Sequence, residues 1–404
     1  MKRDISVSLV TGVVLTVVCC LLSSGRSEAG ETRGVSDNLI KMGILLDLTG
    51  PAAANVTQIL EGIKVHNEYI NEKGGINGRK IKLLVEDDHY SIPVTIAAFK
   101  KLVFKDKVFA LYGPSSTGGT VSLFRKVEKN RIPILPPSLA DTIVVPYKRY
   151  FFTVAASYAE SMYVVVDYIV KDLHEKNPRI ALCYPDTEGG KGDLVPALAR
   201  LKQYGIKPVS KEVLNYGSID AATQVMSMKR AKVDYVITCG QCIGTAVVLL
   251  RDVVKYGFKP KKVFGSYATC DDDTVKGAGK AARFFVGVHV MNSWHDDTPE
   301  LAEMRNITLR LRPGTEEKPR SKFYVFGWVM DMIYKEGLRR AGRDLNNEVL
   351  VDAMEGMSVN TSGLCGPTGY SSTSHKGGDC WRLFKTDMER GKLVPLTGWL
   401  MPSK

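Results

Sequence analysis

The sequence has 404 residues, with 55 Lys and Arg against 43 Asp and Glu, which gives a formal net charge of +12 at pH 7. This length suggests about two domains and is ample for two apolar cores. The basic residues are scattered, without a long basic run or a basic motif interleaved with aromatic residues. The charge therefore indicates a solvated basic surface and argues against nucleic acid as a partner.

Residues 1–29 have the layout of a secretory signal peptide, with a basic start, an apolar stretch over 5–22 and small residues at the end. We predict cleavage after Ala29 and export to the periplasm. A membrane anchor is the alternative, because the apolar stretch comes close to the length of a transmembrane span. Cys19 and Cys20 are not preceded by the small residues of a lipoprotein signal, so lipid anchoring is not expected. No later apolar run approaches ~20 residues, so the mature chain is expected to be soluble.

The even number of cysteines beyond the signal peptide predicts disulfides in an exported protein. Cys365 and Cys380 flank a polar, Gly-rich loop that a disulfide would close. Cys239 and Cys242 form "CGQC", for which disulfide bonding, a thioredoxin-like redox site and a zinc site are the three interpretations. A zinc site that includes Cys270 lacks a clear fourth ligand. Disulfide bonding of Cys239 and Cys270 is favoured, with the pairing of the central cysteines left open.

The first part of the chain alternates between strand and helix patterns. Continuous apolar runs of strand length are separated by segments whose apolar residues recur at helical spacing. Asn55, with Gln58 three residues later, resembles a capping box at a helix N-terminus. Gly74, Gly75 and Gly78 are typical of a sharp reversal from a helix into a parallel strand. The predicted strands cover 39–47, 80–88, 108–113, 131–136 and, at an edge or crossover, 150–154; the predicted helices cover 55–73, 93–104 and 120–130.

A second alternation of the same plan follows. Its predicted helices cover 158–173, 194–204, 221–229 and 245–256, and its predicted strands cover 179–185, 207–214, 233–240, 261–267 and, at an edge or crossover, 283–291. Three helical patterns at 299–311, 323–340 and 346–356 come next, before a β-rich end. Strand and helix alternation of this kind predicts the α/β fold class, with two doubly wound parallel sheets.

Ligands of doubly wound sheets bind at the carboxyl edge of the strands, and we expect the two domains to turn these edges toward a shared cleft. Ser115, Ser116 and Thr117 follow a strand and begin a helix. The free N–H groups of a helix N-terminus favour an anion or a carboxylate, with plain N-capping as the alternative. The other candidate ligand-binding residues are Ser138, Ala140, Tyr158, Gln241 and Asp271.

The sequence contains no convincing catalytic set. The segment "GPSSTGGT" at 113–120 lacks the lysine of a phosphate-binding loop, and neither an HExxH nor a GxSxG motif is present. The six histidines are dispersed along the chain. We therefore do not expect an enzyme, and we predict neither a cofactor nor a metal.

The motifs "LTGP" at 48–51 and "GGINGR" at 74–79 resemble the amino-terminal signature of type I periplasmic solute-binding proteins. The similarity continues through "KLVFKDKVFALYGPSSTGGT" and "RIPILPPSLAD", and it is greatest to the branched-chain amino acid (Leu/Ile/Val) receptors of ABC transporters. The resemblance implies two lobes joined by three crossovers, with a ligand clamped between them. It places lobe I at 38–152 plus 292–362, and lobe II at 153–291 plus 363–404.

The resemblance also implies a monomer that binds a branched-chain amino acid or a related small organic solute and delivers it to ABC transporter permease subunits. Ser115 and Ser116 would hold the ligand carboxylate, and an acid within 271–273 would meet its ammonium group. Leu139 stands where family members often have Thr, and Asn55 where they often have an aromatic residue. A ligand other than a branched-chain amino acid therefore stays open.

Two further interpretations stay open. The chain could be a ligand-sensing subunit of a signalling system that uses the same fold. It could also be a thiol redox protein built on Cys239 and Cys242.

Overall fold

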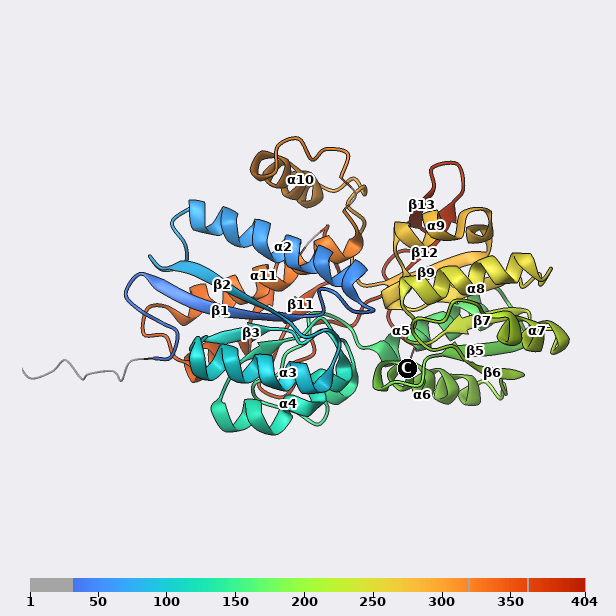
Figure 1. The fold of residues 1–404 in the computed structure, drawn as a ribbon, viewed down its shortest axis with the longest axis horizontal. Helices are drawn as coiled ribbons and strands as arrows, with labels where there is room; N and C mark the ends of the chain where they lie inside the picture. The colour runs from blue at the N-terminus through green and yellow to red at the C-terminus, as the bar shows by residue number, and fades with distance from the viewer. Residues whose placement is uncertain (1–31, 319, 362, 404) are drawn as a thin grey trace, which may run out of the picture.

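The computed structural model describes residues 32–318, 320–361 and 363–403, and the predicted signal peptide at 1–29 lies outside these ranges. The described chain forms two α/β lobes that lie side by side along the longest axis (Figure 1). Each lobe is built on one main sheet whose faces are covered by helices. Among the described residues, no helix is both long enough and apolar enough to cross a membrane.

Lobe I contains a parallel sheet of four strands in the order β2-β1-β3-β4. This order places the first strand of the chain in the interior, where Met42, Ile44 and Leu45 are fully buried. A strand covered on both faces needs such a continuous apolar run. The strands are β1 (Leu39–Leu46), β2 (Lys80–Asp87), β3 (Ala110–Tyr112) and β4 (Ile134–Leu135). The helices are α2 (Ala53–Glu72), α3 (Ile92–Lys100), α4 (Thr117–Asn130), α10 (Pro299–Leu311), α11 (Lys322–Ala341) and α12 (Asn347–Met354).

Helices α2 and α11 pack against each other at two glycines. A Cβ atom added at Gly62 would overlap the carbonyl oxygen of Tyr324, and one added at Gly327 would overlap the carbonyl oxygen of Ile59. The two backbones therefore approach more closely than any larger residue would allow. Because α11 lies far along the chain, this contact completes lobe I with a segment that follows most of lobe II.

Lobe II contains a seven-stranded sheet in the order β13-β12-β9-β8-β7-β5-β6. The pairs from β9 to β6 are parallel, and the C-terminal hairpin adds two antiparallel strands to β9. The strands are β5 (Ile180–Tyr184), β6 (Ser210–Val213), β7 (Tyr235–Thr238), β8 (Lys262–Gly265), β9 (Phe285–His289), β12 (Arg382–Asp387) and β13 (Lys392–Pro395). The helices are α5 (Tyr158–Asp167), α6 (Glu188–Gln203), α7 (Ala222–Arg230), α8 (Ile243–Lys255) and α9 (Asp272–Ala278).

Three crossovers join the lobes, as the predicted fold class requires, and they lie close together. Met291 forms a β-bridge with Cys365, and the N–H of Asn292 donates to the carbonyl of Leu364 at 2.8 Å. The N–H of Thr153 in the first crossover donates at 3.0 Å to the carbonyl of His375, which lies in the loop after the third crossover. Figure 1 shows these links at the narrow junction of the two lobes. The lobes are therefore connected by one compact hinge region.

The loop after the third crossover returns to lobe I. β11 (Thr368–Gly369) pairs with β10 (Ser358–Val359), and the ring of His375 stacks on Phe152 with centroids 3.9 Å apart. The prediction assigned residues 363–404 to lobe II, whereas this loop, which includes residues 368–375, packs against lobe I. The remaining bounds of the two lobes stay a prediction.

Three local expectations are corrected. Residues 283–291 contain β9, which lies inside its sheet because the C-terminal hairpin covers its second edge. Residues 150–154 form only an isolated bridge through Phe151. Helix α2 has Ala52 as its N-cap, so Asn55 lies within the first turn and its side chain is free for another role.

The predicted disulfides are absent, since all six cysteines in the described residues are free thiols. Cys270 packs its sulfur against the backbone of Gly287 in β9, whereas Cys239 directly follows β7, and β8 separates these strands. The thiol of Cys365 donates to the carbonyl of Gly366 at 3.2 Å rather than bonding to Cys380.

The glycine contact between α2 and α11 can be tested by substitution. Gly327→Ala should lower the free energy of unfolding by about 1–3 kcal/mol, because the added methyl group forces the helices apart. Gly244→Ala is the matched control in α8, where a Cβ atom meets nothing within 4 Å. That control should be neutral or stabilising by roughly 0.5–1 kcal/mol. Chemical denaturation measures both values, and equal effects would contradict the close contact.

Candidate functional site

A cavity of about 630 Å³, counting its mouth, lies between the two lobes. Segments at the carboxyl ends of β1, β2, β3 and β4 reach it from lobe I, and segments after β7 and β8 reach it from lobe II. Its polar lining includes Asn55, Ser115, Thr117, Asp193 and Ser266. Its aromatic lining is Tyr90, Tyr158, Tyr216, Tyr267 and Phe323. The cleft predicted at the carboxyl edges of the sheets is therefore present.

On the lobe I side, the N-terminus of α4 faces the cavity. Ser116 is the N-cap, and its Oγ accepts the backbone N–H of Gly119 at 2.9 Å. The Oγ of Ser115 accepts the backbone N–H of Asp47 at 2.7 Å, which leaves the hydroxyl proton of Ser115 able to donate. The hydroxyl of Thr117, which lines the cavity, is hydrogen-bonded to Ser138 at 2.8 Å. This end of α4 presents hydroxyl groups and a positive helix dipole.

On the lobe II side, Asp193 projects from the second turn of α6. Its side chain is 2% exposed, and Oδ2 accepts the backbone N–H of Gly240 at 2.7 Å. Oδ1 is buried and has no protein partner. Burial raises the pKa of Asp193 to about 7, while the hydrogen bond from Gly240 acts in the opposite direction. Among the described residues that line the cavity, Asp193 alone carries an ionisable carboxylate or a basic group.

Two contacts cross the mouth of the cavity and join the lobes. The side-chain amide of Asn55 donates to the carbonyl of Ala268 at 2.8 Å. The rings of Tyr90 and Tyr216 meet edge to face, with centroids 6.0 Å apart. The first residue of each pair belongs to lobe I and the second to lobe II. The structure therefore shows the lobes closed over the cavity.

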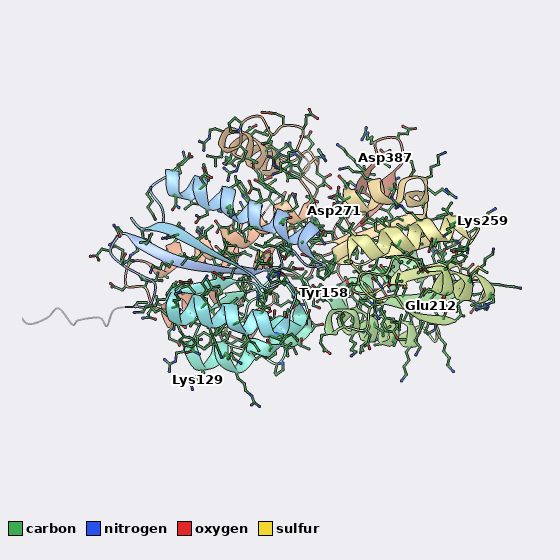
Figure 2. All side chains as sticks on the ribbon, viewed as in Figure 1. Lys129, Tyr158, Glu212, Lys259, Asp271 and Asp387 are labelled. Atoms are coloured by element: carbon green, nitrogen blue, oxygen red, sulfur yellow. The ribbon has the colours of Figure 1, made fainter. Side chains whose placement is uncertain are left out.

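The structure brings several of the predicted site residues together. Ser115, Thr117 and Tyr158 line the cavity, and Figure 2 shows Tyr158 where the lobes meet. Ser116 and Ser138 are buried: Ser116 accepts the backbone N–H of Gly119, and Ser138 is hydrogen-bonded to the side chain of Thr117. The serine loop thus serves both of the roles considered for it, helix capping and cavity lining.

The other three predicted residues lie elsewhere. Ala140 is buried and does not reach the cavity. Gln241 is fully buried, and its amide donates to the carbonyl of Leu214 at 2.9 Å. Asp271, labelled in Figure 2, is the N-cap of α9. It lines a separate pocket with Lys276 and Arg320. The structure therefore places Asp271 outside this cavity.

Sequence reasoning missed Asp193, Tyr216 and Tyr267. Asp193 lies inside a helix, where the pattern gives an acid no special role. Tyr216 lies in the connection after β6, and no motif in the neighbouring sequence indicates a binding site. Tyr267 had a usable signal, because it follows β8 directly at the carboxyl edge of the sheet.

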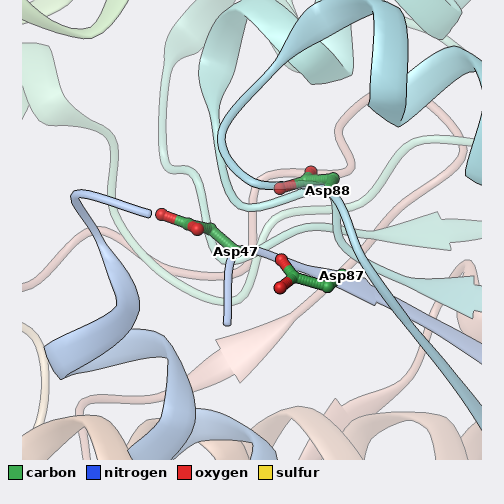
Figure 3. A group of neighbouring side chains, drawn as sticks. All are labelled: Asp47, Asp87 and Asp88. Atoms are coloured by element: carbon green, nitrogen blue, oxygen red, sulfur yellow. The ribbon is translucent and has the colours of Figure 1, made fainter. Parts of the chain in front are cut away.

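Asp47, Asp87 and Asp88 form the one acidic group in the described residues with ligand atoms close enough to share a metal ion (Figure 3). Their oxygens are already used by neighbouring backbone groups. Asp47 accepts the N–H of Ala52 at 2.8 Å, Asp87 that of Leu48 at 2.9 Å, and Asp88 that of Tyr90 at 3.0 Å. Burial raises the pKa of Asp88 to about 6. These acids fix the turns after β1 and β2, which position the cavity wall.

The geometry of "CGQC" does not favour redox chemistry. Cys239 is fully buried, and burial raises the pKa of its thiol well above the usual value. Reactive thiols have a lowered pKa and are accessible. The half-buried Cys242 contacts the hydroxyl of Thr245 at 3.4 Å.

Two α/β lobes that close over one cavity define a class of hinged binding proteins, in which domains close around a ligand. A family model described as "Periplasmic binding protein" matches residues 39–392, and the chain belongs to this family. The family consists of solute-binding proteins rather than enzymes.

The similarity extends over most of the chain. Leu/Ile/Val-binding protein homolog 7 of Brucella abortus is 22% identical over 388 residues, which cover 92% of this chain and 94% of the relative. A branched-chain amino acid ABC transporter structure from Thermus thermophilus with bound valine matches with TM-score 0.83 and 22% identity, covering 91% and 97% of the two chains. A fatty acid ABC transporter substrate-binding protein from Thermomonospora curvata matches with TM-score 0.80 and 18% identity, covering 92% and 95%. The shared fold therefore does not fix the ligand.

Thiol labelling of the native protein tests the burial of "CGQC". Cys242 and Cys380 are half-buried and should react first with a thiol reagent, whereas Cys239 should stay unlabelled until the protein unfolds. Mass spectrometry of a labelling time course measures this order, with denatured protein as the control for full reaction. Equal labelling rates for Cys239 and Cys242 would support the redox interpretation.

Proposed function

We propose that this protein is the extracytoplasmic solute receptor of an ABC importer and binds an amino acid or a related small organic solute between its lobes. The observation that carries this proposal is the closed cavity, which has a helix N-terminus on one wall and one buried carboxylate on the other. Export through the predicted signal peptide, a periplasmic location, a monomeric state and delivery to permease subunits belong to the same proposal.

The wall formed by α4 suits a ligand carboxylate. The hydroxyl of Ser115 can donate a hydrogen bond, and the dipole of α4 favours negative charge at this position. Thr117 adds a second hydroxyl on the same wall. No Lys or Arg is among the described residues that line the cavity, so the anion would be held by hydroxyl and N–H donors.

The wall formed by α6 suits an ammonium group. Oδ1 of Asp193 is a buried acceptor without a protein partner, and an N–H donor from a ligand would satisfy it. A cation at this position would also favour the charged form of the carboxylate. Asp193 replaces the acid within 271–273 as the proposed ammonium partner.

Transport is preferred over sensing as the downstream role. The structures that match this fold are named as transporter components. An operon that encodes a permease and an ATPase would favour import, whereas a kinase gene in that place would favour the sensing alternative.

Loss of one hydroxyl should weaken ligand binding. Ser115→Ala should reduce affinity for the preferred solute by about 1–3 kcal/mol, because a charge-assisted hydrogen bond is lost. Ser122→Ala is the control, since Ser122 belongs to the same helix and its hydroxyl donates to Gly119 within that helix at 2.7 Å. Isothermal calorimetry on solutes found by a thermal-shift screen measures both variants. Unchanged affinity in Ser115→Ala would reject the carboxylate site.

Affinity for an amino acid should depend on pH through Asp193. The raised pKa of about 7 means that this carboxyl is protonated below neutrality, and the ammonium group must compete with that proton. Affinity should therefore fall by roughly tenfold per pH unit below pH 7 and level off above it. Asp193→Asn should bind more weakly and remove this dependence, which separates Asp193 from Asp88, whose pKa is about 6. A flat profile in the unmodified protein would contradict the role of Asp193.

A further inference from the structure

A surface hollow of about 940 Å³, counting its mouth, lies at the end of lobe I that is remote from the interlobe cavity. Leu39, the first residue of β1, and Lys107, which precedes β3, are among its lining residues. The interlobe cavity is reached from the carboxyl ends of the same strands. In Figure 1 the described chain begins at the end of lobe I that points away from lobe II. The hollow and the cavity therefore lie at opposite edges of one sheet.

The charged residues that line the hollow all have the same sign. They are Arg33, Lys41 and Lys107, and no Asp or Glu is among the described residues of the lining. Within the described ranges, none of these three side chains forms an ion pair with an acid. The ammonium group of Lys41 donates instead to the backbone carbonyl of Asp106 at 3.4 Å. The positive charge of the hollow is therefore not neutralised by the protein around it.

An exposed aromatic ring stands beside these bases. Phe104 lines the hollow and is 58% exposed, and among the described residues it is the one Phe or Trp of the exposed class. It belongs to the single π-helical turn Lys101–Lys105 that follows α3, and turns of this kind are frequent at functional sites. Leu102 and Val103 in the same turn are buried. The core is thus filled by its neighbours, and Phe104 faces solvent between the exposed Lys101 and Lys105.

The hollow is a fixed feature of the fold. The backbone of Gly34 has a φ of 74°, and a Cβ atom added there would lie 2.6 Å from the carbonyl oxygen of Lys107. Lys107 itself has a φ of 56°, a conformation that is uncommon outside glycine. Arg33 donates to the carbonyls of Val108 at 3.1 Å and Asn130 at 3.2 Å. The first described segment is therefore held tightly against the segment that carries Phe104 and Lys107.

We propose that this end of lobe I docks on an anionic membrane surface, with its basic side chains at the lipid phosphates and Phe104 among the upper parts of the acyl chains. Peripheral membrane binding combines electrostatic attraction to anionic lipids with burial of apolar side chains. The hollow offers both, because bases without acids line it together with Phe104, Val103 and Leu39. A lipid phosphate complements the unneutralised charge, and an exposed ring loses contact with water when it enters the interface.

The position of the chain start supports the same partner. Thr32, the first described residue, belongs to the lining of the hollow. The sequence before it contains the apolar stretch over 5–22, which directs the chain to a membrane whether it acts as a signal peptide or as an anchor. The docking surface therefore follows the membrane-directed segment immediately. Docking at this edge of the sheet would leave the interlobe cavity open to solutes, and the inference does not depend on the proposed function.

Vesicle binding tests the proposal. The chain that begins at Gly30 is the protein to use, because the apolar stretch would itself enter a bilayer. It should sediment with vesicles made of equal parts of phosphatidylglycerol and phosphatidylcholine, and stay in solution with phosphatidylcholine alone. Phe104→Ala should lower the partition coefficient at least about fivefold through lost apolar burial. Lys107→Glu should lower it by a similar factor through reversed charge.

Two variants in lobe II are the matched controls. Ile219→Ala removes an apolar side chain that is 92% exposed, and Lys259→Glu reverses a charge at the far end of lobe II, where Figure 2 labels it. Both should bind the anionic vesicles as the unsubstituted protein does. All four variants should keep the unfolding temperature of the unsubstituted protein, since the changed side chains are exposed.

Phe104→Trp reports on insertion of the ring itself. Its added fluorescence, measured against the unsubstituted protein with its four Trp residues, should shift to the blue on anionic vesicles and be quenched by brominated acyl chains. Absence of binding to anionic vesicles, unchanged binding of Phe104→Ala or Lys107→Glu, or an equal loss in Lys259→Glu would each overturn the proposal. Displacement by inorganic phosphate at an ionic strength matched with chloride would show a site for soluble anions and would also overturn it. In all of these cases the proposed function stands.

Discussion

The close packing of α2 against α11 is the constraint on which the architecture depends. Gly62 and Gly327 let the two backbones touch, and this contact completes lobe I with a helix that follows β9 of lobe II in the chain. A chain that must return to its first lobe has to cross between the lobes more than once. The crossovers then lie side by side at one junction, and the carboxyl edges of both sheets meet across a single cleft. The position of the cavity is therefore a consequence of the chain path.

Buried polar groups differ in their hydrogen bonding between the core of lobe I and the cavity. In the core of lobe I, one buried charged group is fully paired: Asp331 binds His66 at 2.8 Å and Lys335 at 2.7 Å, although all three side chains are nearly inaccessible. At the cavity, Asp193 and Tyr267 are equally buried but keep atoms without partners. The same fold therefore pairs buried charged groups in one place and leaves buried polar atoms unpaired in another. The difference must arise from the local surroundings of each group. Unsatisfied groups cluster where a ligand can complete them.

The sequence predicted the class of fold because strand-length apolar runs and helical periodicity alternate along nearly the whole chain. It also predicted the serine loop, since Ser115 directly follows β3 and precedes α4. It could not predict Asp193, because the side of α6 that faces the cavity is set by how the lobes close. Asp271 follows β8 only a few residues after Tyr267 does, yet it lines a separate pocket. Sequence spacing predicts that a residue lies at the carboxyl edge of a sheet. The packing of the folded chain determines which cavity its side chain reaches.

Asn55 connects ligand binding to closure of the lobes. Its Nδ2 donates to Ala268 in the opposite lobe, while Oδ1 of the same amide lacks a partner beside the cavity. One planar group therefore holds the closed form with one atom and offers the other to the ligand. A ligand that donates to Oδ1 fixes the amide in the orientation that the cross-lobe hydrogen bond requires. Because this arrangement exists only when the lobes are closed, the proposed function implies that a ligand donating to Oδ1 would bind the closed state more tightly and shift the population toward it. In the proposed function the same side chain would contribute to recognition and to closure, so a solute without an N–H donor would lose both effects together.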